Sequence, residues 1–181
     1  MMMEFNMVDN SNPLIDSEFL LKLRNIYSAE NYCFRRIPGL LKKIPDNRLH
    51  NLLTEHLPII IERKKRIENI FNQINVKTSG AVCITFKTLI SKAGNSIYHI
   101  KPKQNHVTYD LLSTLIEISI YRCSIYNFLN QHIANVQKPV LTNALKRCLS
   151  EEDDFFHSLL KIKKSMASAE SIFSTSLLQP A

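Results

Sequence analysis

The sequence predicts an all-α protein built as a four-helix bundle. Apolar residues recur at steps of three and four over four separate segments, and this spacing places them along one face of a helix. Only 3 of the 181 residues are glycine, so few positions favour turns of positive φ. Each of the four apolar faces also contains one charged residue. Together these observations indicate a bundle with a polar layer in its core.

The first predicted helix begins at Glu18, where Asp16 or Ser17 can cap its free N–H groups, and it runs towards Ile44. Pro38 lies inside this helix and should kink or briefly interrupt it, because proline has no backbone N–H to donate. The residues expected on its inward face are Leu23, Tyr27, Glu30, Phe34, Ile37 and Leu41.

The second predicted helix follows the break at Pro45 and is capped by Asp46. It runs to about Asn75, with a bend expected at Pro58. The residues expected on its inward face are Leu49, Leu53, His56, Ile60, Arg63, Ile67 and Ile70.

A long connection separates the second helix from the third. Residues 81–92 are expected to form a short helix inside it, and residues 93–95 end that helix with a glycine. Residues 96–106 are expected to be a connector. The apolar side of the short helix consists of Val82, Phe86, Leu89 and Ile90.

Two further helices complete the bundle. Thr108 is expected to cap the third, which runs to about Ala134, and Pro139 suits the first turn of the fourth, which runs to about Ala167. The inward face of the third helix should hold Leu111, Leu115, Ile118, Arg122, Ile125 and Leu129. That of the fourth should hold Leu141, Leu145, Cys148, Glu152, Phe155 and Leu159.

The domain organisation follows from these elements. Residues 1–15 are expected to be a flexible N-terminal arm, residues 16–167 the bundle, and residues 168–181 a flexible C-terminal tail. Two helices, a long crossover carrying a short extra helix, and two more helices make the order found in ferritin-like four-helix bundles. We therefore expect an all-α, ferritin-like architecture.

The chain is basic, with a formal net charge of +7. Such a charge permits contact with phosphate groups or anionic lipid, so a basic surface protein that binds nucleic acid is one hypothesis. The densest basic run is residues 63–66, and one of its arginines is predicted to face inward. We favour a solvated helix face for this run, and expect no specific nucleic-acid partner.

The cysteine pattern and the chain termini bear on location. The four cysteines form no C-x-x-C pair and no zinc-like spacing with histidine, and each lies in apolar sequence, which indicates buried thiols in a reducing compartment. The start of the chain lacks the pattern of a secretory signal, and no apolar stretch is long enough to span a bilayer. We expect a cytoplasmic protein with no membrane partner. The cysteines are Cys33, Cys83, Cys123 and Cys148.

Several segments resemble the YciE/YciF-type ferritin-like proteins, a bacterial family associated with stress. The most specific match is residues 19–30, which end in Tyr-Ser-Ala-Glu. The other matching segments, in the same order as in the family, are Ile37-Pro38, Glu55-His56-Leu57, residues 66–71 and residues 149–152. The resemblance covers residues 17–162 and implies a helical bundle with a role in stress.

The same resemblance implies a carboxylate-bridged di-iron-type centre inside the bundle. Glu30 matches one family ligand, and Glu151 or Glu152 matches another on the fourth helix. The remaining positions depart from the family. Residues 59–60 are Ile-Ile where the family has Glu-Thr, and residues 121–124 are Tyr-Arg-Cys-Ser where it has Glu-His-Tyr-Glu.

Two hypotheses account for the charged residues of the inward faces. In the first, two carboxylates pair with two guanidinium groups in a buried ionic layer, and no cofactor is needed. This layer consists of Glu30, Arg63, Arg122 and Glu152. In the second, a reduced site binds iron or manganese. Its ligands would be Glu30, Glu151, Glu152 and either His56 or Glu117.

The first hypothesis leads us to expect a non-catalytic, metal-free protein with a structural or interaction role. The second makes the protein a metal-binding bundle with a reduced carboxylate site. Nucleophilic triads, glycine-rich phosphate loops and H-E-x-x-H runs are absent from the sequence, so no class of enzyme is indicated. A homodimer formed through helix faces is compatible with this architecture, and the sequence names no protein partner.

Overall fold

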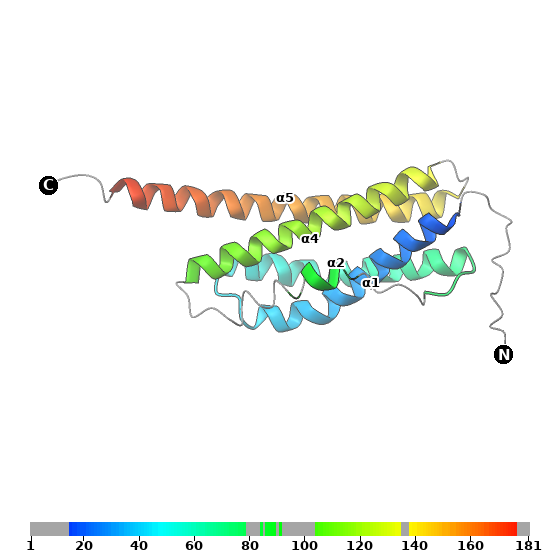
Figure 1. Cartoon of the computed structure of the whole chain (residues 1–181), viewed down its shortest axis with the longest axis horizontal. Helices are drawn as coiled ribbons and strands as arrows, with labels where there is room; N and C mark the ends of the chain where they lie inside the picture. Colours follow the sequence, from blue (N-terminus) through cyan, green and yellow to red (C-terminus); the bar gives the residue numbers. More distant parts are fainter. Residues whose placement is uncertain are drawn as a thin grey trace.

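The computed structural model of the protein describes residues 15–78, 84, 86–89, 91, 104–134 and 138–176, and the side chains of all of these except 104–107 and 169–176. The described residues form four long helices and contain no strand (Figure 1). The all-α prediction is therefore confirmed. The helices are α1 (Ser17–Leu41), α2 (Asn47–Gln73), α4 (Gln104–Ile133) and α5 (Pro139–Ser176).

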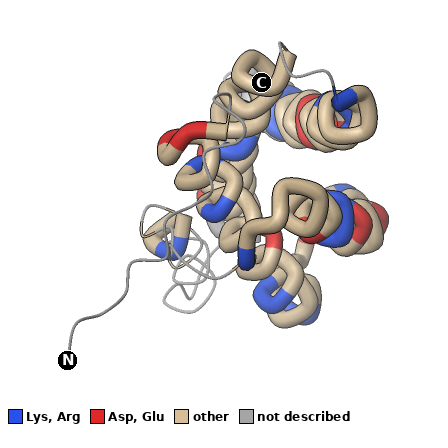
Figure 2. The backbone as a smooth tube through the Cα atoms, turned by 90° about the vertical axis from the view of Figure 1, so that its right-hand side faces the viewer, with Lys and Arg blue, Asp and Glu red and all other residues tan. Residues whose placement is uncertain are grey.

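Each helix packs against two others, in the ring order α1, α2, α5, α4. In Figure 1, α1 and α5 run from right to left and α2 and α4 from left to right, so every neighbouring pair is antiparallel. Figure 2 looks along the bundle and shows the helices grouped around a shared interior. Because α2 ends and α4 begins at opposite ends of the bundle, residues 74–103 have to span its length, as the sequence predicted for the crossover.

Predicted side chains cap the N-terminal ends of the first two helices. Of the two possible caps for α1, the structure uses Asp16, whose carboxylate accepts from the N–H of Phe19 at 2.7 Å. Asp46 accepts from the N–H groups of Arg48 and Leu49 at 2.9 and 3.1 Å and begins α2. Both helices continue through their internal prolines, and α1 ends at Leu41, before the predicted Ile44.

Two predicted boundaries are wrong. Helix α4 begins at Gln104, so Thr108 is inside the helix and buried, and it does not cap it. Helix α5 continues past Ala167 to Ser176. The sequence offers no stop signal at either place, because residues 104–107 and 165–176 contain neither glycine nor proline.

The inward faces of α2, α4 and α5 consist of the predicted residues, all of which are buried. Helix α1 differs at three positions, because Phe34 is 40% exposed, with Cys33 buried in its place, and Tyr27 and Leu41 are only half-buried. The α1 face passes through the small side chains of Ala29 and Cys33, which leave room for the neighbouring helices. The next inward residue after Glu30 is therefore Cys33, three positions along the helix, and not Phe34, four positions along.

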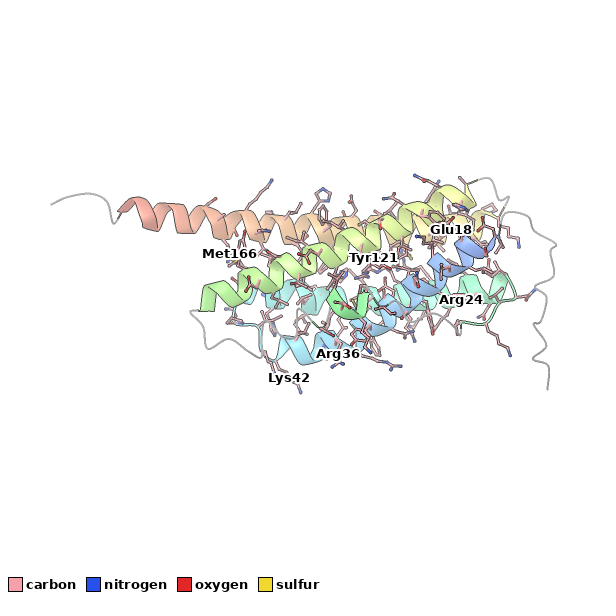
Figure 3. The ribbon with its side chains drawn as sticks, in the orientation of Figure 1. Glu18, Arg24, Arg36, Lys42, Tyr121 and Met166 are labelled. Atoms are coloured by element: carbon pink, nitrogen blue, oxygen red, sulfur yellow. The ribbon has the colours of Figure 1, made fainter. Side chains whose placement is uncertain are left out.

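Among the described residues of the short helix, the buried Phe86 and the partly buried Leu89 pack against the bundle. The described residues 84, 86–89 and 91 are helical, in agreement with the predicted short helix, and Phe86 is buried. Its ring lies 6.5 Å from the ring of Tyr32 on α1 and 6.1 Å from that of Tyr121 on α4, which Figure 3 labels. The predicted positions Val82 and Ile90, the glycine stop, residues 1–14 and residues 177–181 lie outside the described residues, whereas residues 168–176 of the predicted flexible tail belong to α5.

Replacing Phe86 with alanine tests whether this contact holds the crossover in place. We expect the Phe86→Ala variant to lose roughly 3–5 kcal/mol in the free energy of unfolding, because removal of a buried aromatic ring leaves a cavity. The matched control is Ile84→Ala, a change to a side chain that is 75% exposed, which should cost less than about 0.5 kcal/mol. Equal losses in urea unfolding would contradict this packing.

Candidate functional site: a buried ionic layer

One charged side chain from each helix enters the middle of the bundle. Glu30 on α1, Arg63 on α2 and Glu152 on α5 are completely buried, and Arg122 on α4 is 1% exposed. The apolar residues above and below them form the rest of the core. Four full charges are thus removed from water, and this is stable only where the charges are paired and hydrogen-bonded.

The two arginines bridge the two glutamates in a closed ring. Arg122 donates through Nη2 to both carboxylate oxygens of Glu30, at 2.6 and 2.7 Å, and the same nitrogen lies 3.0 Å from Oε2 of Glu152. Arg63 donates through Nη1 to Oε2 of Glu152, and its Nε lies 3.5 Å from Oε1 of Glu30. Each guanidinium therefore contacts both carboxylates, and the formal charges of the layer sum to zero.

Two hydroxyl groups complete the shell of the carboxylates. Tyr126 donates to Oε1 of Glu30 at 2.6 Å, and Ser119 donates to Oε1 of Glu152 at 2.5 Å. Sequence reasoning did not identify either residue. The available signal was their position on α4, because they lie four residues after and three residues before Arg122 and hence on the same face.

His56 extends the layer along α2, and its ring stacks on Phe155 with centroids 3.7 Å apart. Its Nε2 lies 2.7 Å from Nη2 of Arg63. A guanidinium has donors only, so Nε2 has to accept, and the ring is the neutral form that carries its proton on Nδ1. Burial lowers the pKa of His56 well below its usual value, and the charges of Arg63 and Arg122 lower it further.

The charges of the layer support one another electrostatically. Burial acts to raise the pKa of Glu30, but Arg122, Arg63 and the hydroxyl of Tyr126 outweigh it and leave the pKa below its usual range. Burial acts to lower the pKa of Arg122, and the carboxylates of Glu152 and Glu30 raise it well above its usual value. All the attractions in this ring require the ionised forms.

Glu151 does not join the layer. Its carboxylate accepts from Arg66 at 2.8 Å on each oxygen and from Arg147 at 3.0 Å, in a separate cluster between α2 and α5. Glu117 is exposed on α4. The residues predicted as ligands of a reduced metal site are thus divided between the buried ring, this cluster and the surface.

The donor set of the layer does not fit iron or manganese. A di-metal centre needs several carboxylates whose negative charge is free to offset the ions. Here the charges of Glu30 and Glu152 are already offset by two guanidinium groups, which cannot lose their protons. Within the described parts of the chain, no group of three or more His, Cys, Asp or Glu side chains is placed to hold a metal ion.

The described cysteines are free thiols with raised pKa values. Burial raises the pKa of Cys33 to about 12 and that of Cys123 and of Cys148 to about 11, so all three are protonated at neutral pH. A thiol in this state is a poor nucleophile and a poor metal ligand. Cys33 instead lies 3.9 Å from Nη1 of Arg122 and fills space beside the layer.

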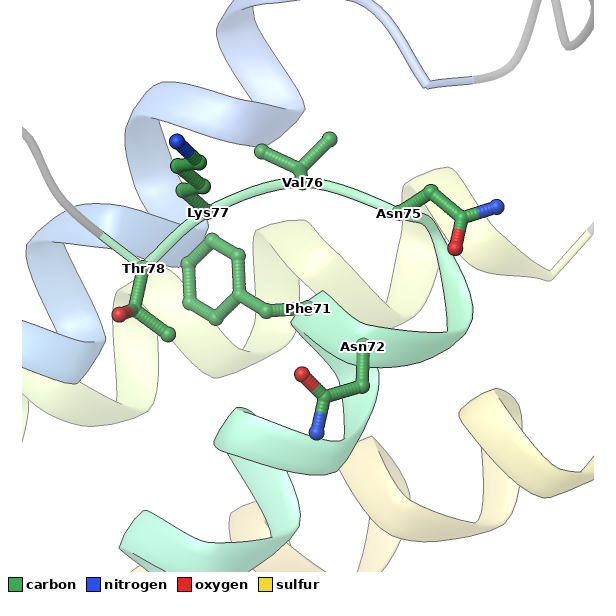
Figure 4. Close-up of a pocket in the computed structure, with 6 residues that line it drawn as sticks. All are labelled: Phe71, Asn72, Asn75, Val76, Lys77 and Thr78. Atoms are coloured by element: carbon green, nitrogen blue, oxygen red, sulfur yellow. The ribbon is translucent and has the colours of Figure 1, made fainter.

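Two hollows open near these elements. A small one of about 170 Å³ lies between α2 and α5, with His56 in its wall and Glu55, Glu151 and Asp154 among the residues that line it. A larger one of about 520 Å³ lies at the end of α2 (Figure 4). Its described lining consists of Phe71, Asn72, Asn75, Val76, Lys77 and Thr78, with no carboxylate, histidine or cysteine.

Fold and site define an all-α bundle whose core contains one layer of paired charges. The model of the family described as a domain of unknown function (DUF892) matches residues 15–171. The chain belongs to this family. No curated protein matches the chain. Among the described residues, none of the helices is both long enough and apolar enough to cross a bilayer.

Two solved structures are similar to the whole bundle. The Escherichia coli stress protein YciF is 21% identical, with a TM-score of 0.79, over 85% of this chain and 97% of that one. YcfI of Rhodopseudomonas palustris, described as a candidate structural protein, is 20% identical, with a TM-score of 0.75, over 86% of this chain and 96% of that one. These matches confirm the resemblance to YciF-type proteins, and at these identities they show a shared fold.

Removing one member of the layer should be costly. We expect Glu30→Ala to lower the free energy of unfolding by on the order of 3–5 kcal/mol, because two buried guanidinium groups lose a carboxylate. Urea unfolding measures the loss. The exposed Glu62 supplies the control, since Glu62→Ala should hardly move the unfolding midpoint. A loss below about 1 kcal/mol for Glu30→Ala would show that the layer is not buried as described.

The neutral state of His56 gives a second test, which is the pH dependence of the free energy of unfolding. Since its folded pKa is lowered, the unfolded chain takes up a proton between about pH 7 and 5 that the folded chain refuses, and stability falls as the pH falls. The variant His56→Gln keeps an oxygen that can accept from Arg63 but cannot take up a proton. Its stability should decline less over this window than that of the wild type. Equal declines in parallel urea titrations would contradict a neutral His56.

Proposed function

We propose that this protein is a non-catalytic, metal-free ferritin-like bundle that serves a structural or interaction role, with a link to stress adaptation. The observation that carries the proposal is the arginine pair at the centre of the layer. The family resemblance implies metal ions at the centre of the bundle, and in this chain two guanidinium groups supply positive charge there.

The chemistry of the layer supports a structural role. Its two arginines keep their protons at any ordinary pH, and its two carboxylates are held by hydrogen bonds from Arg63, Arg122, Tyr126 and Ser119. No proton is poised for transfer near neutral pH, and the neighbouring thiols are protonated. Such an arrangement fixes how the four helices align, and none of the four charged groups of the layer is free to act as a nucleophile or general base.

The similar structures agree with this proposal without establishing it. One is described as a stress protein and the other as a candidate structural protein. Neither description concerns a catalysed reaction. For this chain, the link to stress rests on family membership and the structural role rests on its own core.

Metal analysis tests the proposal. The protein is purified without chelator, incubated with Fe(II) or Mn(II), passed through a desalting column and measured by elemental analysis. We expect a folded protein with far less than one metal ion per chain, because the two arginines already offset the charges of both carboxylates of the layer.

The Glu30→Ala variant shows where any metal would bind. A stoichiometric metal that disappears in this variant would overturn the proposal and favour a reduced metal site. A metal that persists equally in both proteins would lie outside the layer, and the proposal of a metal-free core would stand.

A further inference from the structure

The positive charge of the chain is concentrated in two stretches. Residues 31–45 and 69–109 contain no aspartate or glutamate, and together they hold 9 of the 23 lysines and arginines. The remaining residues hold 14 basic and 16 acidic side chains and are therefore slightly acidic. The net charge of +7 thus originates entirely from these two stretches.

The first stretch forms the outer side of the second half of α1. Arg35, Arg36, Lys42 and Lys43 are all exposed there, and Figure 3 labels Arg36 and Lys42. Arg35 and Arg36 lie within the last two turns of α1, Lys42 is its C-terminal cap and Lys43 follows in the turn, so the four charges gather at this end of the helix.

The second stretch adds a fifth exposed cation, on a segment that packs against α1. The guanidinium carbon of Arg36 lies 5.3 Å from the ring centre of Tyr32, and the same ring contacts Phe86 of the crossover. Lys87 follows Phe86 and is exposed. We call this surface the α1 cationic face, and its residues are Arg35, Arg36, Lys42, Lys43 and Lys87.

The densest basic run of the sequence differs from the α1 cationic face in its ion pairing. In residues 63–66, Arg63 is buried between carboxylates, Lys64 lies 3.1 Å from Glu68, and the other two cations contact acidic residues at 2.8 Å. On the α1 cationic face, by contrast, none of Arg35, Arg36 and Lys42 has an ion pair with any described residue. The first run is neutralised by acidic side chains, whereas Arg35, Arg36 and Lys42 meet no acidic side chain among the described residues.

Helix electrostatics explain only part of this face. Cations stabilise the C-terminal end of a helix, which suits Lys42 at the cap of α1. That effect falls off within the last turn, and Arg35 and Arg36 lie further back. Arg36 contacts the ring of Tyr32 but no carboxylate, and no contact of Arg35 with an acidic side chain is found among the described residues.

We propose that the α1 cationic face binds the phosphate backbone of double-stranded nucleic acid without reading its sequence. Several exposed cations spread over the end of α1 and the adjoining crossover match a polymer of regularly spaced phosphates better than a single small anion. A lipid surface fits less well, because the apolar side of this helix, with Ile37 and Leu40, is packed in the core and cannot insert between lipids.

This inference is independent of the metal-free core, since the face and the ionic layer share no residue. The probe is a fluorescein-labelled DNA duplex of about 20 base pairs, with binding followed by anisotropy at KCl concentrations between about 50 and 200 mM. The face variant combines Arg35→Gln, Lys42→Gln and Lys87→Gln. The control variant combines Lys64→Gln, Lys65→Gln and Arg147→Gln, three cations that contact acidic side chains, so both variants lose three positive charges. Thermal unfolding of each variant checks that it is folded.

We expect wild-type binding to weaken steeply with salt. The face variant should bind at least tenfold more weakly at the lowest salt, and its salt slope should fall by about 0.9 for each phosphate that it no longer neutralises. The control variant should stay within about threefold of the wild type. Equal losses in both variants would mean that net charge alone attracts the duplex and would overturn the proposal. So would binding to vesicles of anionic lipid but not to DNA, or no binding at all.

Discussion

The closed ring of two arginines and two glutamates holds the four helices in one alignment. Each helix contributes one charge to it, so no helix can shift along the axis or rotate without separating a buried ion from its partners. Removing a buried charge from its partner costs several kcal/mol, whereas apolar side chains can exchange neighbours at lower cost. The layer therefore fixes the alignment of the four helices more strictly than the surrounding leucines and isoleucines do.

Such a layer is not a source of great net stability. The desolvation of four charges consumes much of their mutual attraction, and well-packed apolar side chains can equal a buried ion pair. The structure reduces the loss by satisfying the carboxylates with Tyr126 and Ser119 as well as with the arginines. The Nε atoms of Arg63 and Arg122 still lack a hydrogen-bond acceptor, so the satisfaction is incomplete. Specificity of assembly is the benefit that explains such a layer best.

The charge of the layer also differs from that of a core that binds metal. A bundle that binds metal holds excess negative charge until the ions arrive, whereas this core is neutral as it folds. Any binding activity is therefore expected at the surface of the molecule. There the charge is uneven, because acidic side chains neutralise residues 63–66 and leave the outer side of α1 positive.

Helical periodicity in the sequence was enough to predict the helices and most of the core. Steps of three and four placed Arg63, Arg122 and Glu152 inside, because this periodicity is a local property of the chain. It could not decide that Phe34 faces out and Cys33 in, since both positions are near one helical edge and the neighbouring helix selects between them. It also could not reveal that His56, Ser119 and Tyr126 contact the ring. Those contacts depend on how the helices pack, and only the tertiary structure brings their atoms within hydrogen-bonding distance.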